Sequence, residues 1–185
     1  MLVVEGPDGA GKTTLIKTLQ EYLDLPVAPR VVSKDAEAMV DLQSWVDNQL
    51  DEGFQPMIYD RHRLISETIY GPILRRAQAD GFNELKWLAP RMRRFYELEP
   101  VIIYCLPSLE TVMSNVIGDI NNRVVESKIE AIYAAYVARA ALDYSFSPGL
   151  VKIWDYENSA KINNMPTWIN KVREEIEFRR ASKND

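Results

Sequence analysis

Residues 6–13 read Gly6-Pro7-Asp8-Gly9-Ala10-Gly11-Lys12-Thr13 and match the pattern G-x-x-x-x-G-K-S/T at every fixed position. The glycines let the backbone turn tightly, so that several N–H groups converge on one anion. A helix that begins directly after the loop points its positive end at the same anion. The lysine of this pattern reaches the outer phosphates of a nucleotide, and the hydroxyl residue ligates Mg²⁺. The stretch therefore predicts a phosphate-binding loop.

The segments on both sides of this loop supply the context that the pattern requires. Residues 2–5 form a short apolar run that is typical of a buried strand, and apolar residues recur at helical spacing between residues 15 and 23. We therefore expect a strand before the loop and a helix over about residues 12–23. The expected nucleotide-binding residues are Gly6, Asp8, Gly9, Ala10, Gly11, Lys12, Thr13 and Thr14.

Short apolar runs alternate with helical patterns along the rest of the chain. The apolar runs predict strands at residues 27–32, 56–59, 101–106 and 150–154. The helical patterns predict helices at residues 35–50, 64–79, 84–96, 109–117, 127–144 and 165–180. Five strands that alternate with helices imply an α/β fold, doubly wound around a parallel sheet with helices on both faces. The ligand site of such a sheet lies beyond the carboxyl ends of its strands.

Composition limits the class of protein. The 185 residues are 46% hydrophobic and carry a net charge of −5, which argues against non-specific nucleic-acid binding but does not exclude a local basic groove. No apolar run approaches the roughly 20 residues that span a bilayer, and no signal segment precedes the first strand, so we expect a cytoplasmic protein with no membrane partner. The single cysteine, Cys105, lies in an apolar run and predicts a buried structural thiol.

A second motif, Asp60-Arg61, follows the strand predicted at residues 56–59, and Ser66 and Tyr70 come after it on the next predicted helix. Thymidylate kinases, and more loosely deoxynucleoside kinases, carry Asp/Glu-Arg at this strand end, followed by a serine and a tyrosine. They also typically hold an acidic residue where Asp8 stands. The segment 122–126 is similar to their lid. The chain therefore resembles this family, most strongly at residues 2–19 and 57–71.

The resemblance implies a single domain over residues 1–185 with a short lid near 118–126, the strand order 2-3-1-4-5 and a possible homodimer. It also implies a role for each matching residue. Arg61 would hold the acceptor phosphate or the transferring phosphoryl group, Asp8 would bind the sugar 3′-hydroxyl, and Tyr70 would pack against the deoxyribose. The implied catalytic residues are Lys12, Asp60, Arg61 and Arg123, and the implied metal ligands are Thr13 and Asp60. The implied acceptor-binding residues are Asp8, Arg61, Ser66, Glu67 and Tyr70.

This resemblance predicts ATP and Mg²⁺ as cofactors and transfer of the γ-phosphoryl group to a deoxynucleotide, a pyrimidine deoxynucleoside monophosphate. A deoxynucleoside acceptor is an alternative. The chain departs from the family between its second and third predicted strands, where no arginine lies between Arg30 and Arg61. Trp45 is the obvious stacking residue in this stretch, although a tryptophan there also suits the core. The identity of the base therefore stays open.

Two further hypotheses come from other features. Four basic residues are interleaved with aromatic ones between positions 86 and 96, a mixture that suits a nucleic-acid groove: Lys86, Trp87, Arg91, Arg93, Arg94, Phe95 and Tyr96. The acceptor would then be a modified base such as 5-hydroxymethyluracil in DNA, and the alternative is a solvated helix face whose aromatics enter the core. A nucleotide-binding switch without catalysis is the third hypothesis, but an Asn-Lys-x-Asp guanine motif is missing from the sequence.

Overall fold

Four parallel strands form the centre of the molecule in the computed structural model, which describes residues 1–29, 37–53, 55–74, 85–117, 123–159 and 165–181. The strands are β1 (Leu2–Glu5), β2 (Ile58–Asp60), β3 (Val101–Cys105) and β4 (Val151–Trp154). They lie in the order β2-β1-β3-β4, and every neighbouring pair is parallel. The register pairs Val4 with Asp60 and Glu5 with Tyr104, so the carboxyl ends of β1, β2 and β3 meet at one edge.

The prediction of a fifth strand at residues 27–32 was wrong, because the described sheet has four strands. Val27 makes only an isolated parallel bridge to Ile58, and the amide of Ala28 donates to the carbonyl oxygen of Ile58 at 2.8 Å. Pro29 follows and has no N–H to continue the ladder. Residues 30–32 lie outside the described residues. The bridge stands at the β2 edge, where the order 2-3-1-4-5 puts the second strand, and the other four strands lie in the expected order.

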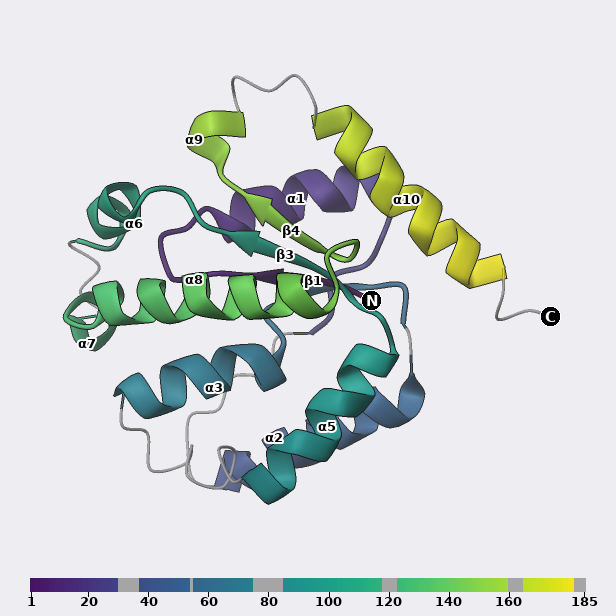
Figure 1. The fold of residues 1–185 in the computed structure, drawn as a ribbon, viewed down its shortest axis with the longest axis horizontal. Coiled ribbons are helices and arrows are strands. Elements are labelled where there is room, and N and C mark those ends of the chain that lie inside the picture. Colours follow the sequence, from purple (N-terminus) through teal and green to yellow (C-terminus); the bar gives the residue numbers. More distant parts are fainter. Residues whose placement is uncertain (30–36, 54, 75–84, 118–122, 160–164, 182–185) are drawn as a thin grey trace.

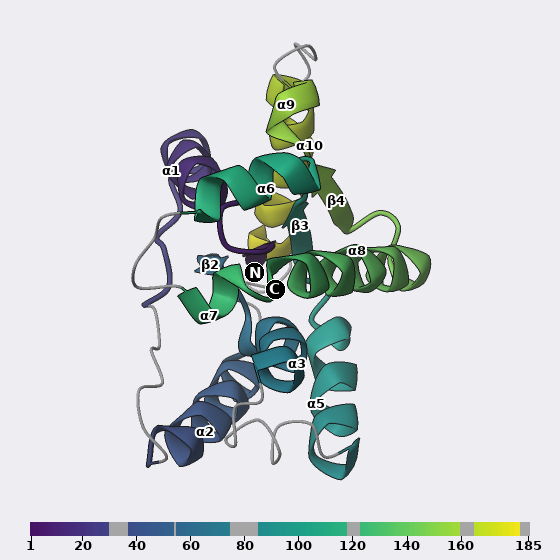
Figure 2. The same ribbon diagram turned by 90° about the vertical axis from the view of Figure 1, so that its left-hand side faces the viewer.

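Helices cover both faces of the sheet, as expected for a doubly wound fold (Figure 1). On one face lie α1 (Lys12–Leu23) and α10 (Met165–Ala181). On the other face lie α3 (Arg63–Leu74) and α8 (Ile129–Phe146), with α2 (Glu37–Glu52) and α5 (Leu85–Glu97) packed beyond α3 (Figure 2). The shorter helices are α6 (Leu109–Val116), α7 (Arg123–Glu126) and α9 (Tyr156–Ser159).

The core forms where the two central strands meet the helices. Every residue of β1 and β3 is buried, as expected for parallel strands that are covered on both faces. Leu15 and Leu19 of α1 are buried on the side of the helix that faces the sheet, and each such side chain stabilises the fold by about 1.5–3 kcal/mol. Cys105 at the end of β3 is buried too, and burial raises the pKa of its thiol to about 12. The expected structural thiol is therefore confirmed.

Two expected elements are described only in part. The helix expected over residues 64–79 is described up to Leu74, and the rest of it falls on residues 75–79, outside the described part of the chain. The expected lid near 118–126 is described from Arg123 onward, where α7 begins. Within the described ranges, no helix combines the length and apolar character needed to cross a bilayer.

Candidate active site

The phosphate loop lies between β1 and α1 at the carboxyl edge of the sheet, as its sequence predicts. Gly6 and Gly9 have positive φ angles of 141° and 77°, which glycine adopts without strain. A Cβ at Gly6 would lie 2.5 Å from the carbonyl oxygen of Cys105, and one at Gly9 would lie 2.8 Å from that of Val112. These two glycines are therefore required both by the backbone conformation and by the space that the neighbouring elements leave.

A pocket of about 690 Å³ opens beside the loop, a volume typical of small-molecule sites. Residues 8–14 line one side of it, and Asp60 and Arg61 line another. The two sequence motifs meet here because β1 and β2 are neighbouring parallel strands that end at the same edge. The structure therefore brings together Asp8, Lys12, Thr13, Thr14, Asp60 and Arg61, as predicted from their positions after strands.

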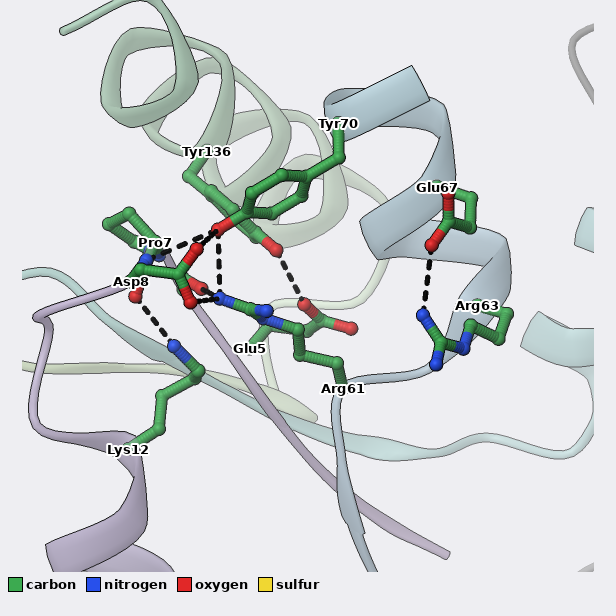
Figure 3. Close-up of polar contacts among 10 residues, drawn as sticks. Glu5, Pro7, Asp8, Lys12, Arg61, Arg63, Glu67, Tyr70 and Tyr136 are labelled. Atoms are coloured by element: carbon green, nitrogen blue, oxygen red, sulfur yellow. Dashed lines mark hydrogen bonds and ion pairs between the residues drawn. The ribbon is translucent and has the colours of Figure 1, made fainter. Parts of the chain in front are cut away.

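Arg61 is the centre of the polar contacts in this pocket (Figure 3). Its Nη2 donates to Asp8 Oδ1 at 2.7 Å and to the hydroxyl of Tyr70 at 2.8 Å. Its Nε and Nη2 also donate to the carbonyl oxygen of Gly6, at 3.3 and 3.2 Å. The Tyr70 hydroxyl in turn donates to Asp8 Oδ2 at 2.9 Å. Three of the residues expected to bind the acceptor are therefore joined in one network.

The network keeps both partners of the Arg61–Asp8 pair charged. Burial alone would raise the pKa of Asp8, but the charges of Arg61 and Lys12 outweigh it and hold that pKa below its usual value. Burial alone would lower the pKa of Arg61, but the surrounding tyrosines and Asp8 raise it above its usual value. The Arg61 side chain is 12% exposed, so its positive charge is held close to the loop and largely shielded from solvent.

Lys12 is folded back onto the loop. Its Nζ donates to the carbonyl oxygen of Pro7 at 2.5 Å, and the residue is buried (Figure 3). Burial, together with repulsion from Arg61, lowers the pKa of Lys12 to about 8. Phosphate oxygens are stronger acceptors for an ammonium group than a neutral carbonyl. A bound triphosphate would therefore draw Nζ away from Pro7 and raise the pKa of Lys12 back toward its usual value.

Thr13 and Asp60 fit the role of Mg²⁺ ligands. Both line the pocket and carry oxygen atoms, the donors that Mg²⁺ prefers. In the described part of the chain, no group of three or more His, Cys, Asp or Glu side chains would hold a metal ion alone. A Mg²⁺ ion at Thr13 and Asp60 would therefore depend on the oxygens of the nucleotide and of water, which is how Mg²⁺ is usually bound beside phosphates.

Gly6, Ser66, Glu67, Tyr70 and Arg123 do not line this pocket, although Gly6 and Tyr70 accept hydrogen bonds from Arg61 at its wall. The hydroxyl of Ser66 is buried and donates to the carbonyl oxygen of His62, one turn earlier. Glu67 is buried and forms an ion pair of 2.9 Å with Arg63, one turn along α3 from Tyr70 (Figure 3). Arg123 begins α7 and is exposed. The roles of all the expected site residues stay predictions.

Two residues that the sequence did not predict cover the loop from α6 and α9, the helices that follow β3 and β4. Asn115 of α6 donates from Nδ2 to the carbonyl oxygen of Gly9 at 2.9 Å and to the hydroxyl of Tyr156 at 3.1 Å. The ring of Tyr156 lies so close to Gly11 that a Cβ there would be 2.9 Å from it. Both residues line the pocket. They come from separate segments with no shared spacing, so no sequence motif signals them.

His62, the only histidine of the chain, is fully buried directly after Arg61. Its ring centroid lies 4.5 Å from that of Phe95 and 5.6 Å from that of Trp45. Trp45 also packs edge-on against Tyr59, with ring centroids 6.4 Å apart, which favours the core alternative for this tryptophan. Burial, reinforced by the charge of Arg63, lowers the pKa of His62 to about 3.

The buried imidazole gives a prediction that one NMR signal can check. We expect the His62 ring resonances of the folded protein to stay unchanged from pH 8 to pH 5, whereas an exposed histidine titrates near 6.5. The unfolded chain takes up a proton near pH 6.5 and the folded chain only near 3. The free energy of unfolding therefore decreases as the pH falls through this window. A midpoint near 6.5 in the folded protein would contradict the burial of His62.

The three arginines of α5 make ion pairs within the protein. Each of its three arginines pairs with a carboxylate at 2.6–2.8 Å: Arg91 with Asp47, Arg93 with Glu97, and Arg94 with Asp51. Phe95 is fully buried, and the Tyr96 hydroxyl donates to Asp143 at 2.5 Å. These contacts favour the alternative of a solvated helix face whose aromatics enter the core.

Comparison with known proteins places the fold. No protein-family model matches the chain, and no curated protein matches its sequence. Among solved structures, deoxyadenosine kinase from M. mycoides with bound dATP has a TM-score of 0.60 and 16% identity, over 92% of this chain and 98% of that one. The same kinase with bound dCTP has a TM-score of 0.56 and 15% identity, over 96% and 99% of the two chains.

A further similar structure is the YorR protein from Bacillus subtilis, in complex with phosphorylated GDP. Its TM-score is 0.56 and its identity 16%, over 99% of this chain and 96% of that one. These likenesses cover nearly the whole length of all the chains. They show that this chain shares its α/β fold with deoxyadenosine kinase and the YorR protein.

Proposed function

We propose that the protein is an ATP-dependent kinase that transfers the γ-phosphoryl group to a deoxynucleotide. The observation that carries this proposal is the meeting of Lys12 and Arg61 in one pocket beside the phosphate loop. The two cations come from separate motifs at the ends of neighbouring strands. A triphosphate held by the loop would extend its terminal phosphate toward both. The kinase fold of the similar structures supports the same reaction.

Positioning and neutralisation of charge account for most of the catalysis of phosphoryl transfer. The loop N–H groups and the start of α1 would bind the inner phosphates, and Lys12 would neutralise the outer ones. The planar guanidinium of Arg61 would hold the transferring group with two parallel hydrogen bonds. When bound at Thr13 and Asp60, Mg²⁺ would supply further positive charge beside the outer phosphates. Asp60 would also accept a proton where the acceptor group is a hydroxyl.

The acceptor would lie on the Asp8–Tyr70 side of Arg61. Asp8 would accept a hydrogen bond from the sugar 3′-hydroxyl, and the Tyr70 ring would pack against the deoxyribose and disfavour a 2′-hydroxyl. Glu67 accepts hydrogen bonds but cannot donate them while ionised, so it would read a base N–H or an exocyclic amine. We propose a pyrimidine deoxynucleoside monophosphate, as in thymidylate kinases.

The test is phosphoryl transfer from γ-labelled ATP with Mg²⁺ to two sets of acceptors. One set holds free deoxynucleosides and their monophosphates, and the other holds duplex DNA with and without 5-hydroxymethyluracil. We expect label on one free deoxynucleoside monophosphate. Label on modified DNA alone would show that the acceptor is a base in DNA and not a free nucleotide. The basic face of α5 would then be the candidate DNA-binding surface. Binding of ATP without transfer to any acceptor would contradict the kinase.

A further inference from the structure

Glu5 is the last residue of β1 and stands directly before the phosphate loop. Its side chain is fully buried, yet it carries a carboxyl group. Oε1 accepts a hydrogen bond of 2.6 Å from the backbone N–H of His62. Oε2 accepts one of 3.1 Å from the hydroxyl of Tyr136 (Figure 3). A buried carboxyl group is costly unless it is hydrogen-bonded, so its two partners indicate what it does here.

The first partner fixes the backbone at Arg61. Arg61 has a φ of +66°, a conformation that residues other than glycine seldom adopt. The Arg61 N–H donates to the carbonyl oxygen of Val4 at 3.0 Å, and the next N–H along the chain, that of His62, donates to Glu5. Two successive hydrogen bonds to β1 therefore hold the left-handed turn. This turn sets the direction in which the Arg61 side chain leaves the backbone.

The second partner supports the other side of the guanidinium. Tyr136 projects from α8, and its ring lies edge-on to that of Tyr70, with centroids 6.1 Å apart. The Tyr70 hydroxyl accepts from Arg61 and donates to Asp8. Glu5 therefore joins three elements, β1, the turn into α3, and α8, at the point where they surround Arg61.

We propose that Glu5 is a positioning residue that fixes the Arg61 guanidinium over the phosphate loop. It acts through His62 and Tyr136 and makes no contact with the reacting groups itself. This inference rests on the proposed function, because the role of the guanidinium is to hold the transferring phosphoryl group. Small displacements of such a group cost large factors in rate, about 10²-fold for about 1 Å.

The test compares three substitutions of Glu5. Glu5→Met removes both acceptor oxygens at similar size, and we expect kcat to fall by about 10- to 10²-fold with the KM for ATP within about 2-fold. Glu5→Asp keeps the carboxyl group but shortens the side chain and withdraws it from His62, so kcat falls in the same direction. Glu5→Gln keeps one carbonyl oxygen for the His62 N–H, and we expect it to restore kcat to within about 5-fold of wild type.

Asp143 offers a matched control. It is also fully buried and accepts hydrogen bonds from tyrosine hydroxyls, those of Tyr96 and Tyr104, but it does not line the pocket. Asp143→Leu is expected to lower the temperature of unfolding while leaving kcat within about 2-fold where the protein is folded. Equal losses of kcat in the Glu5 and Asp143 variants would overturn the inference, because general loosening would explain both.

Two measures separate this inference from the proposed function. If Glu5→Met does not fold, Glu5→Asp carries the test, and an unchanged kcat in that variant overturns the role of Glu5. The second measure does not depend on turnover. It follows the NMR resonance of the Arg61 Nε–H, which is assigned because it disappears in Arg61→Ala. We expect it to shift and broaden in Glu5→Asp but not in Asp143→Leu. An unaltered resonance overturns the inference, whereas absent transfer by the wild type overturns only the proposed function.

Discussion

Arg61→Ala is expected to lower turnover by at least about 10²-fold while the protein stays folded. The guanidinium is the shielded cation between the loop and the Asp8–Tyr70 pair, and no other arginine lines the pocket among the described residues. Turnover with saturating ATP and acceptor measures the effect, and circular dichroism confirms folding. Near-normal turnover in the folded variant would remove the role assigned to Arg61.

Arg61→Lys is the informative companion variant. Lysine keeps the positive charge but lacks the planar fork that donates to Gly6, Asp8 and Tyr70 at once. We expect it to recover only a small part of the lost turnover. Full recovery would show that charge alone is needed at this position, and the two parallel hydrogen bonds to the phosphoryl group would then be wrong.

Lys12→Ala is expected to reduce turnover by at least about 10²-fold as well, because the side chain is the cation that the loop itself supplies to the outer phosphates. Lys17→Ala is the matched control, since it removes an exposed lysine from the same helix. We expect Lys17→Ala to have the turnover of the wild type. Equal losses in both variants, or normal turnover in Lys12→Ala, would contradict the assignment.

Local patterns were enough to predict most of the fold. The loop, the helix after it and the central strands are each specified by residues close together in the chain, and parallel pairing follows from the alternation of strands and helices. The failure at residues 27–32 has a local cause as well. A short apolar run is present there, but Pro29 removes a ladder donor at the edge of the sheet, and among the described residues 27–29 only Val27 forms a bridge.

The site divides in the same way. Lys12 and Arg61 could be predicted because each belongs to a motif whose position after a strand places it at the carboxyl edge. The sequence could not predict the roles of Asn115 and Tyr156 or the contacts of Glu5, because the residues that they contact are far away in the chain. Glu5 looks like the end of an apolar strand until Tyr136 of α8 is seen to donate to it. Such pairings depend on how whole helices pack, which short patterns do not specify.

The α5 segment carries a pattern that suits two structures, which is why its sequence left both alternatives open. Its interleaved arginines and aromatics fit a nucleic-acid groove as well as they fit a helix that packs on α2 and α3. Only the positions of Asp47 and Asp51 on the neighbouring helix distinguish the two, because they give Arg91 and Arg94 partners within the protein. Surface ion pairs of this kind stabilise the folded protein by about 0–1 kcal/mol each. They are therefore too weak to prevent these arginines from binding another anion.

The most direct test of the account is a crystal structure with Mg²⁺ and a non-hydrolysable ATP analogue. We predict the triphosphate on the loop, with Lys12 Nζ moved from the Pro7 carbonyl oxygen to a phosphate oxygen and the Arg61 guanidinium within hydrogen-bond distance of the terminal phosphate. A triphosphate bound elsewhere, or an Arg61 that stays on Gly6 and Asp8 without touching the nucleotide, would contradict the claim that this pocket is a phosphoryl-transfer site.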